Sequence, residues 1–349
     1  MTATGPIDLG TCAFGRAIDA HGRPLDGGPP LRGRRVILER DAPRPNERAP
    51  IATPLWTGLR VIDGLLTVGR GARVGIFGAP ATGKSSLMET IVDNCVADAV
   101  VVALVGERGR EAERWLARSS ERSTTVCATS DRPAFERIRA ADVALAHASA
   151  LRERGLHVVL VVDSLARVAV AAREIAAADG EPVGRGGYPP SVFARLARML
   201  EVAGALPDGS ITLFATVLND GDERDPVSEA ARALLDGHLA LSSALANAGH
   251  YPSIDLLRSA SRTMDCVTGR EHQRMARLVR HAVAVLERIE DARALGIAAV
   301  QRDERAALEI EPKLLAFLRQ DRGASPWTQT LTQLERIATE LEERVGDRS

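Results

Sequence analysis

The sequence predicts an α/β protein with an open, mainly parallel sheet covered by helices on both faces, followed by a small all-helical domain. Four short runs are rich in β-branched residues and apolar on both faces, which suits buried parallel strands: residues 73–77, 99–105, 157–162 and 211–217. Helical stretches alternate with these runs, as in a doubly wound sheet. After about Glu271 the strand signal ends and apolar residues follow helical spacing.

The same patterns divide the chain into three expected segments. Residues 1–52 form an extended lead-in, because four prolines between Pro43 and Pro54 oppose a continuous helix. Residues 53–270 hold the alternating strands and helices, and residues 271–349 form the helical end. Between two of the strands, Ser130 and Asp131 are expected to cap a helix that crosses back to the next strand.

Composition restricts the class of protein. The chain has 349 residues and a net charge of -1, so no global basic field favours nucleic acid or anionic lipid as the main partner. It has no basic start before an apolar stretch and no membrane-length apolar run, which predicts a soluble, cytoplasmic protein. The four cysteines are scattered without a C-x-x-C pair, and the seven histidines form no H-E-x-x-H motif.

A phosphate-binding loop follows the first apolar run. The stretch "GAPATGKS" fits G-x-x-x-x-G-K-[ST] between a strand and a helix, a context that disfavours a chance match. Backbone N–H groups face the phosphates, Lys84 adds positive charge, and the Ser85 hydroxyl binds Mg²⁺. Ala81 replaces a frequent glycine, which stiffens the turn. The expected phosphate contacts are Gly78, Ala79, Pro80, Ala81, Thr82, Gly83, Lys84, Ser85 and Ser86.

Acidic residues follow two other strands. Asp163 ends "HVVLVVDS", as a Walker B aspartate does, and the alternative is that it caps the following helix. Glu107 follows the run 99–105, with Arg108 and Glu111 close behind, and the alternative is a solvated, charged helix start. Glu107 lies on the edge where such sheets bind ligands, which favours a functional role.

Several longer stretches together resemble one family. They are "LVGERGREAERWL", "GRAIDAHGRPLDG", "RPNERAPIATPLWTGLRVIDGLLTVGRGARVGIF", "GHYPSIDLLRSASRTM" and the run from Val158 to Gly204. The chain resembles the ATPases of type III secretion systems and of the flagellar export apparatus, relatives of the catalytic subunit of rotary ATP synthase. The resemblance is nearly continuous from Gly15 to Met264 and weaker beyond, and it implies a RecA-like P-loop NTPase core.

The resemblance also implies roles for individual residues. Glu107 is similar to the family's catalytic glutamate, Arg108 to the neighbour that helps to hold the site, and Asp163 to the Walker B aspartate. Arg262, in "SASRTM", is similar to the arginine finger that such rings insert into the adjacent subunit's site. Glu111 is expected to contact the magnesium indirectly.

Tyr251, in "HYPSID", resembles an aromatic residue that stacks on adenine, and the alternative is a tyrosine held beside Pro252 by packing.

Two features depart from the family. Its members begin with a small β-barrel, and this chain starts where that barrel should end, so residues 1–52 are expected to be the remnant of the junction in a truncated chain. The helical end keeps "AFLRQ" but lacks the "GAY" and "DP" pattern before it.

The expected function is Mg²⁺-dependent ATP hydrolysis that energises protein export by releasing chaperones and unfolding cargo. The expected partners are identical subunits in a homohexamer, stalk and stator proteins, and chaperone–cargo complexes, without nucleic acid. The protein is expected to be cytoplasmic, at the cytoplasmic face of the inner-membrane export machinery, and peripheral to the membrane at most. The glycine-rich segment 180–191 is expected to face the ring's pore.

Two alternatives remain. One is a family member that binds ATP but does not assemble into a ring, or that acts as a regulatory module. The other is a ring-shaped nucleic-acid motor, which the eleven aromatic residues (three Trp, two Tyr, six Phe) disfavour because stacking platforms are scarce. The matching stretches are common to flagellar and injectisome systems and do not separate them.

Overall fold

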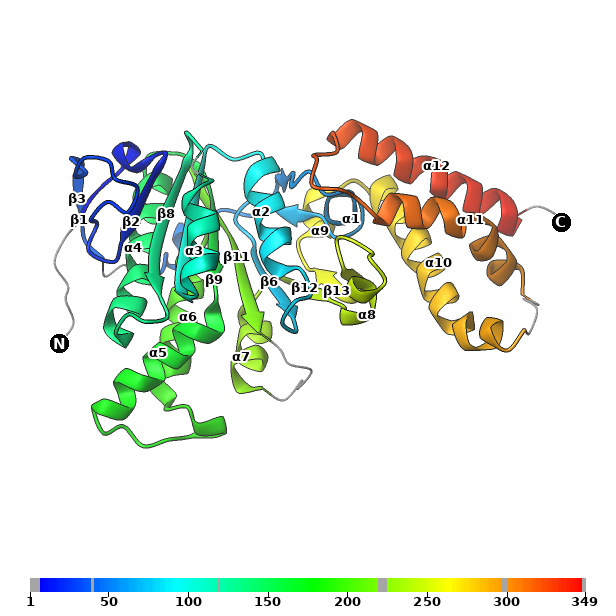
Figure 1. Ribbon diagram of the computed structural model, residues 1–349. Helices are drawn as coiled ribbons and strands as arrows, with labels where there is room; N and C mark the ends of the chain where they lie inside the picture. Colours follow the sequence, from blue (N-terminus) through cyan, green and yellow to red (C-terminus); the bar gives the residue numbers. More distant parts are fainter. Residues whose placement is uncertain (1–6, 39–40, 119, 219–224, 297–300, 347–349) are drawn as a thin grey trace. The chain divides into compact units, whose positions relative to one another are not determined.

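The chain forms two compact units in a computed structural model that describes residues 7–38, 41–118, 120–218, 225–296 and 301–346 (Figure 1). The first unit contains Met1–Ile51, Arg70–Pro80 and Ala97–His238, and the second contains Ala52–Gly69, Ala81–Val96 and Leu239–Ser349. Each unit groups stretches that are separated in the sequence. Residues 1–6 and 39–40 of the expected lead-in lie outside the described residues.

A mainly parallel sheet forms the centre of the first unit, with neighbouring strands in the order β6-β11-β9-β7-β8-β2. The strands are β2 (Arg16–Asp19), β6 (Arg73–Gly78), β7 (Ala99–Glu107), β8 (Ser123–Thr129), β9 (His157–Asp163) and β11 (Ser210–Leu218), and β10 (Gly204–Ala205) pairs antiparallel with β11. The four predicted strands are β6, β7, β9 and β11. Every residue of β7 and β9 is buried, as expected for strands covered on both faces.

Among the strands that the sequence does not predict are β8 and β2. β8 begins with Ser123, Thr124 and Thr125 and therefore lacks the unbroken apolar run by which the other strands were found. β2 comes from the lead-in and pairs in parallel with β8. The lead-in therefore supplies a strand of the main sheet and is not only an extended approach to it.

Helices of the first unit connect the strands: α3 (Gly109–Leu116), α4 (Ala134–Arg152), α5 (Leu165–Ala178), α6 (Pro190–Val202) and α7 (Pro226–Leu234). α4, α5 and α6 pack against one another as a layer, and α4 also packs on β7, β8 and β9. The expected caps of α4 are wrong. Pro133 is the N-cap, the helix begins at Ala134, and the Asp131 carboxylate instead accepts a hydrogen bond from the Thr129 hydroxyl at 2.5 Å.

The short elements of the first unit are β1 (Ile7–Leu9), β3 (Arg34–Val36), η1 (Thr11–Ala13), η2 (Pro45–Glu47) and η3 (Arg185–Gly187).

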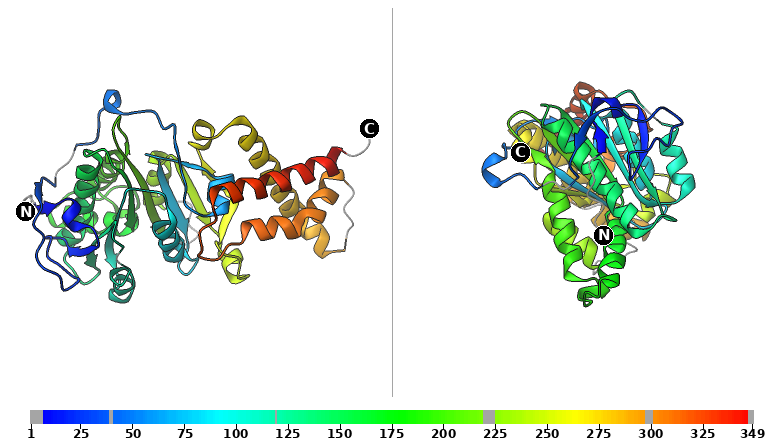
Figure 2. Two further views of the ribbon diagram at one scale, coloured as in Figure 1. Left: turned by 90° about the horizontal axis from the view of Figure 1, so that it is seen from above. Right: turned by 90° about the vertical axis from the view of Figure 1, so that its left-hand side faces the viewer.

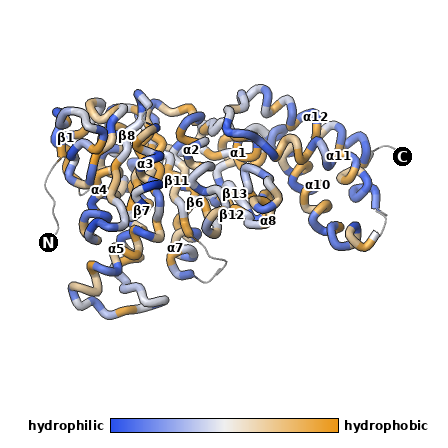
Figure 3. The backbone as a smooth tube through the Cα atoms, in the orientation of Figure 1, coloured by the Kyte–Doolittle hydropathy of each residue, from blue (hydrophilic) through white to orange (hydrophobic). Residues whose placement is uncertain are grey.

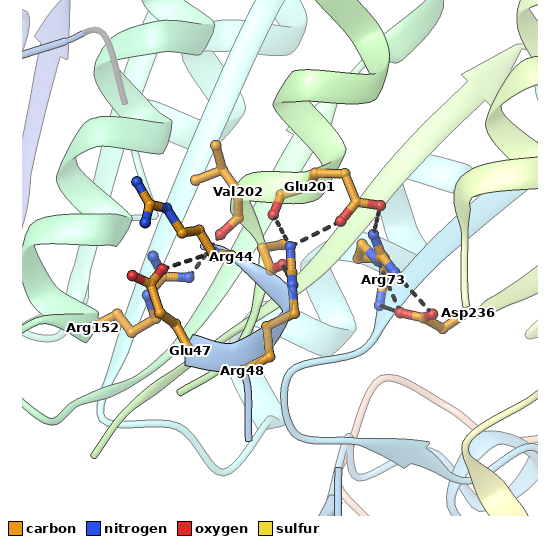
Figure 4. Close-up of polar contacts among 9 residues, drawn as sticks. Arg44, Glu47, Arg48, Arg73, Arg152, Glu201, Val202 and Asp236 are labelled. Carbon is orange, nitrogen blue, oxygen red and sulfur yellow. Dashed lines mark hydrogen bonds and ion pairs between the residues drawn. The ribbon is translucent and has the colours of Figure 1, made fainter. Parts of the chain in front are cut away.

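Arg48 binds the end of the lead-in to helix α6 of the first unit (Figure 4). Just after η2, the Arg48 guanidinium donates to the carbonyl oxygens of Glu201, at 2.6 Å, and Ala203, at 3.0 Å, at the end of α6. The Glu201 carboxylate accepts from both Arg48 and Arg73, and Arg73 also pairs with Asp236.

The second unit is mostly helical. Its helices are α1 (Arg60–Leu65), α2 (Lys84–Asn94), α8 (Ser243–Asn247), α9 (Met264–Val267), α10 (Arg270–Ala294), α11 (Arg302–Leu318) and α12 (Trp327–Gly346). Its strand pairs are β4 (Pro54–Leu55) with β5 (Val68–Gly69), and β13 (Ile254–Ser261) with β12 (Gly237–Leu241), which begins in the first unit.

The predicted helical end is confirmed as α10, α11 and α12, which pack side by side (Figure 2). Hydrophilic and hydrophobic residues alternate along all three helices, as expected when one face of each is buried (Figure 3). The rings of Trp56 and Trp327 stack with centroids 3.5 Å apart and tie the start of α12 to the stretch before α1. No helix in the described part of the chain is long and apolar enough to span a bilayer.

Candidate active site

One edge of the sheet in the first unit gathers three of the predicted residues. The strands β6, β7 and β9 run parallel, so their carboxyl ends meet at the same edge. Gly78 ends β6, Glu107 ends β7 after a bulge, and Asp163 ends β9, where it pairs in register with Leu104. The phosphate loop thus leaves from the sheet edge that also carries both acidic residues.

Glu107 is a buried carboxylate and not the start of a solvated helix. The residue is 5% exposed, and its Oε2 lies 2.6 Å from Nη1 of Arg167 on α5. The same guanidinium nitrogen donates to the carbonyl oxygen of Gly106 at 2.7 Å, so Arg167 holds both the side chain and the backbone before it. Burial at the end of β7 and pairing with an arginine define one orientation for the carboxylate.

The surroundings of Glu107 raise its pKa on balance, because burial outweighs the charge of Arg167. Burial raises the pKa, and a hydrogen bond with Glu111 and the charge of Asp163 raise it further, whereas the charge of Arg167 lowers it. The pKa of Glu111 is lowered, first by that same hydrogen bond. Glu111 lies in the first turn of α3, and Arg108 is the N-cap residue of that helix. The structure therefore brings Glu107, Arg108, Glu111 and Asp163 together at one edge.

Asp163 is also buried, and it does not cap the helix that follows. The N-cap of α5 is Ser164, whose hydroxyl accepts a hydrogen bond from the backbone N–H of Arg167 at 3.3 Å. The Asp163 carboxylate accepts a hydrogen bond at Oδ1 from the hydroxyl of Thr216 on β11, at 2.6 Å. This geometry removes the capping alternative and leaves an oriented carboxylate at the sheet edge.

The phosphate loop has the conformation that its sequence predicts. α2 begins at Lys84, so Lys84, Ser85 and Ser86 form its first turn, where backbone N–H groups lack partners within the helix. Gly83, the N-cap, has φ 92°, and Ala81 has φ 64°, the left-handed region that favours glycine. The stiffness expected from Ala81 therefore corresponds to a residue in a costly backbone conformation.

A cavity of about 310 Å³ lies in the second unit beside the first turn of α2, with Gly83, Ser86, Leu87 and Tyr251 among its lining residues. A Cβ placed on Gly83 would lie 3.6 Å from Cε1 of the Tyr251 ring. Tyr251 is 49% exposed, and its hydroxyl donates to the carbonyl oxygen of Ala246 at 3.3 Å. The half-exposed Tyr251 ring therefore lines a cavity of mixed polar and apolar character beside the loop, and its stacking on adenine stays a prediction.

Arg262 is exposed and lies just after β13 in the second unit. Its neighbours are anchored: the Ser261 hydroxyl donates to the carbonyl oxygen of Thr67 at 2.6 Å, and the Thr263 hydroxyl accepts from the N–H of Gly69 at 3.0 Å. Within the residues that the structure describes, the Arg262 guanidinium has no hydrogen bond or ion pair. The arginine is therefore presented to solvent from a well-held backbone.

Two residues of the site were missed from the sequence. Thr216 is one of two threonines in the apolar run "ITLFATV", and its place near the carboxyl end of that run is the signal that could have identified it. Arg167 carries no such signal, because its pairing depends on the packing of α5 beside the end of β7. Thr216 contacts Asp163 and Arg167 contacts Glu107, so each would orient the carboxylate of a predicted acidic residue.

Magnesium is compatible with the side chains present. The described residues contain no group of three or more His, Cys, Asp or Glu side chains arranged for a metal. Magnesium does not need one, because it is commonly held by one or two carboxylates together with substrate phosphates and water. The Asp163 carboxylate and the Ser85 hydroxyl are oxygen donors of the kind it prefers.

Comparison with known proteins agrees with these features. Residues 58–261 match the nucleotide-binding domain of the ATP synthase alpha/beta family. The chain is 44% identical to the type 3 secretion system ATPase of Pseudomonas syringae pv. tomato, over 97% of this chain and 79% of that protein. It is 42% identical to the flagellum-specific ATP synthase of Bacillus subtilis, over 92% and 76%.

Solved structures give the same picture. The assembled ATPase EscN of the enteropathogenic E. coli type III secretion system superposes with a TM-score of 0.91 and 39% identity, covering 95% of this chain and 83% of that one. EscN in complex with its central stalk EscO superposes with a TM-score of 0.89. The resemblance seen in the sequence is confirmed, as is the P-loop NTPase fold.

Proposed function

Because the chain belongs to the family of type 3 secretion and flagellar export ATPases, we propose that it couples Mg²⁺-dependent ATP hydrolysis to protein export. The observation that carries the proposal is the buried Glu107 carboxylate, oriented by Arg167 at 2.6 Å on the sheet edge from which the phosphate loop leaves. A carboxylate held there can orient and polarise an attacking water.

Each predicted residue has a role in this proposal. Lys84 and the backbone of residues 78–86 hold the phosphates, and Tyr251 stacks on the adenine. Glu107 orients water, Arg108 helps to hold the site, and Glu111 would contact the magnesium indirectly. Ser85 and Asp163 would hold the magnesium, which when bound neutralises charge on the phosphates.

We further propose that the working form is a homohexamer in which Arg262 reaches the neighbouring subunit's site. The exposed guanidinium on an anchored backbone supports this, since an arginine finger must leave its own subunit to stabilise charge on the transferred phosphoryl group. EscN, solved as an assembly and with a central stalk, supports a ring with a stalk partner.

The remaining expectations stay proposals. They are the division into segments 1–52, 53–270 and 271–349, and the position of residues 180–191 at the pore of the ring. They also include binding to stator and chaperone–cargo partners, and location in the cytoplasm at the export machinery. A member that binds ATP without assembling is the alternative, and in it Arg262 would have no site to complete. Assembly state therefore separates the two proposals.

The test is subunit mixing with purified full chain. Lys84→Ala should lose nucleotide binding and turnover, whereas Arg262→Ala should keep ATP binding and lose turnover by about 10³-fold. Mixing the two inactive variants should restore activity, because each supplies the group that the other lacks. Arg258→Ala is the control, because Arg258 is an exposed arginine on β13, the strand just before Arg262, and pairs with Asp255.

Two results would contradict the proposal. ATP turnover that survives Lys84→Ala would remove the phosphate loop from the reaction. Normal turnover by assembled Arg262→Ala, or no recovery on mixing although size measurements show mixed oligomers, would remove the arginine finger.

A further inference from the structure

We infer that Thr216 is a positioning residue that orients the Asp163 carboxylate toward bound Mg²⁺. The inference rests on the proposed function, in which Asp163 is a magnesium ligand. The Thr216 hydroxyl donates to Asp163 Oδ1 at 2.6 Å, a short distance typical of a hydrogen bond to an ionised oxygen. Thr216 is 0% exposed and Asp163 is 8% exposed, so water does not compete freely for this contact.

Sheet register places the two side chains as neighbours. β11 and β9 are parallel, and Ala215 pairs with Val162, so Thr216 and Asp163 are the next residues of their two strands. Neighbours at the same level of adjacent strands point to the same face of the sheet. The contact is therefore set by the backbone ladder and does not depend on flexible side chains.

The chemistry of threonine makes this hydroxyl a good anchor. Its β-branched side chain has restricted rotation about χ1, and a hydroxyl has one proton to donate. Once that proton is directed to Oδ1, the plane of the carboxylate is constrained. Hydrogen-bond partners of metal ligands act in this way, and their loss typically weakens metal binding by about 10- to 100-fold.

The strand offers a matched control in Thr212. It lies four residues earlier on β11 and on the same face, is also 0% exposed, and its hydroxyl accepts from the N–H of Gly71 at 2.8 Å. Valine has nearly the same shape as threonine without the hydroxyl. Thr216→Val and Thr212→Val thus each remove one buried, hydrogen-bonded hydroxyl, and only the first touches Asp163.

The experiment measures ADP binding by the full chain as Mg²⁺ is added, with ADP binding in EDTA as the reference. Thr216→Val should raise the Mg²⁺ concentration at half-saturation by about 10-fold. Its ADP affinity in EDTA should stay within about twofold, because the phosphate loop is unchanged. Thr216→Ser, which keeps the hydroxyl, should restore the wild-type Mg²⁺ concentration at half-saturation. Thr212→Val should lower the unfolding temperature but leave the Mg²⁺ concentration at half-saturation unchanged.

Three results would overturn the inference: an unchanged Mg²⁺ half-saturation in Thr216→Val, an equal shift in Thr212→Val, or no rescue by Thr216→Ser. Failure of the proposed function appears differently. In that case the wild-type chain itself would bind ADP equally well with Mg²⁺ and with EDTA, before any variant is compared.

Discussion

Replacing Arg167 with glutamine should abolish most ATP turnover while leaving ATP binding intact. The substitution removes the guanidinium that lies 2.6 Å from the Glu107 carboxylate and also donates to the Gly106 carbonyl oxygen. Glu107 is then left beside Glu111 and Asp163, whose charges oppose its ionised form. Loss of the Arg167 charge raises the already elevated pKa of Glu107 further and frees its side chain to rotate, and either change would stop the proposed polarisation of water.

The size of the effect follows from burial. The Glu107 side chain is 6% exposed and that of Arg167 is 27% exposed, so this is a largely desolvated pair. Removing one partner of a buried pair costs about 3–5 kcal/mol when the other charge persists. Losing a positioned general base typically costs at least about 10²-fold in rate, equivalent to about 2.7 kcal/mol in the barrier. We therefore expect turnover to fall by at least about 10²-fold.

Arg137→Gln is the matched control. Arg137 also lies beside Gly106, but it pairs with Glu174, whose side chain is 46% exposed, so its loss leaves no buried carboxylate without its partner. Turnover is measured at saturating ATP on preparations of equal oligomeric state, with nucleotide affinity measured separately. If Arg167→Gln keeps turnover within threefold of wild type, Arg167 does not position the catalytic glutamate.

Two further predictions concern the base and the stability of the fold. Tyr251→Ala should weaken ATP binding by about 10-fold through lost stacking without changing the affinity for inorganic triphosphate. Tyr251→Phe should bind ATP normally, since the hydroxyl bonds to Ala246, and equal losses for ATP and triphosphate would contradict base stacking. His147 is 0% exposed, and burial lowers its pKa to about 4, below the 6.5 of an exposed histidine. The unfolded chain therefore takes up a proton first, so stability is complete above pH 6.5 and falls as the pH drops toward 4. This loss should be about 2 kcal/mol between pH 7 and pH 5, measured by urea unfolding. His147→Leu should make the dependence shallower by about that amount, and an unchanged slope would count against a neutral buried histidine.

Much of the fold and of the site follows from local sequence. The strands β6, β7, β9 and β11 could be predicted because parallel strands buried on both faces need unbroken apolar runs. The phosphate loop could be predicted because its glycines, Lys84 and Ser85 act within one continuous turn. The strand-end acids Asp163 and Glu107 could be located because parallel order alone brings carboxyl ends to one edge.

The remaining features were decided by contacts between distant parts of the chain. β8 joins the sheet through its neighbours despite its polar start, and the lead-in strand β2 pairs with it across more than a hundred residues. The capping of α5 by Ser164, the Arg167–Glu107 pair and the Thr216–Asp163 hydrogen bond depend on which strands and helices are adjacent. The sequence by itself determined which groups could act on phosphate and water. Only the tertiary structure decided how those groups are oriented, because orientation comes from partners that strand order and helix packing bring together.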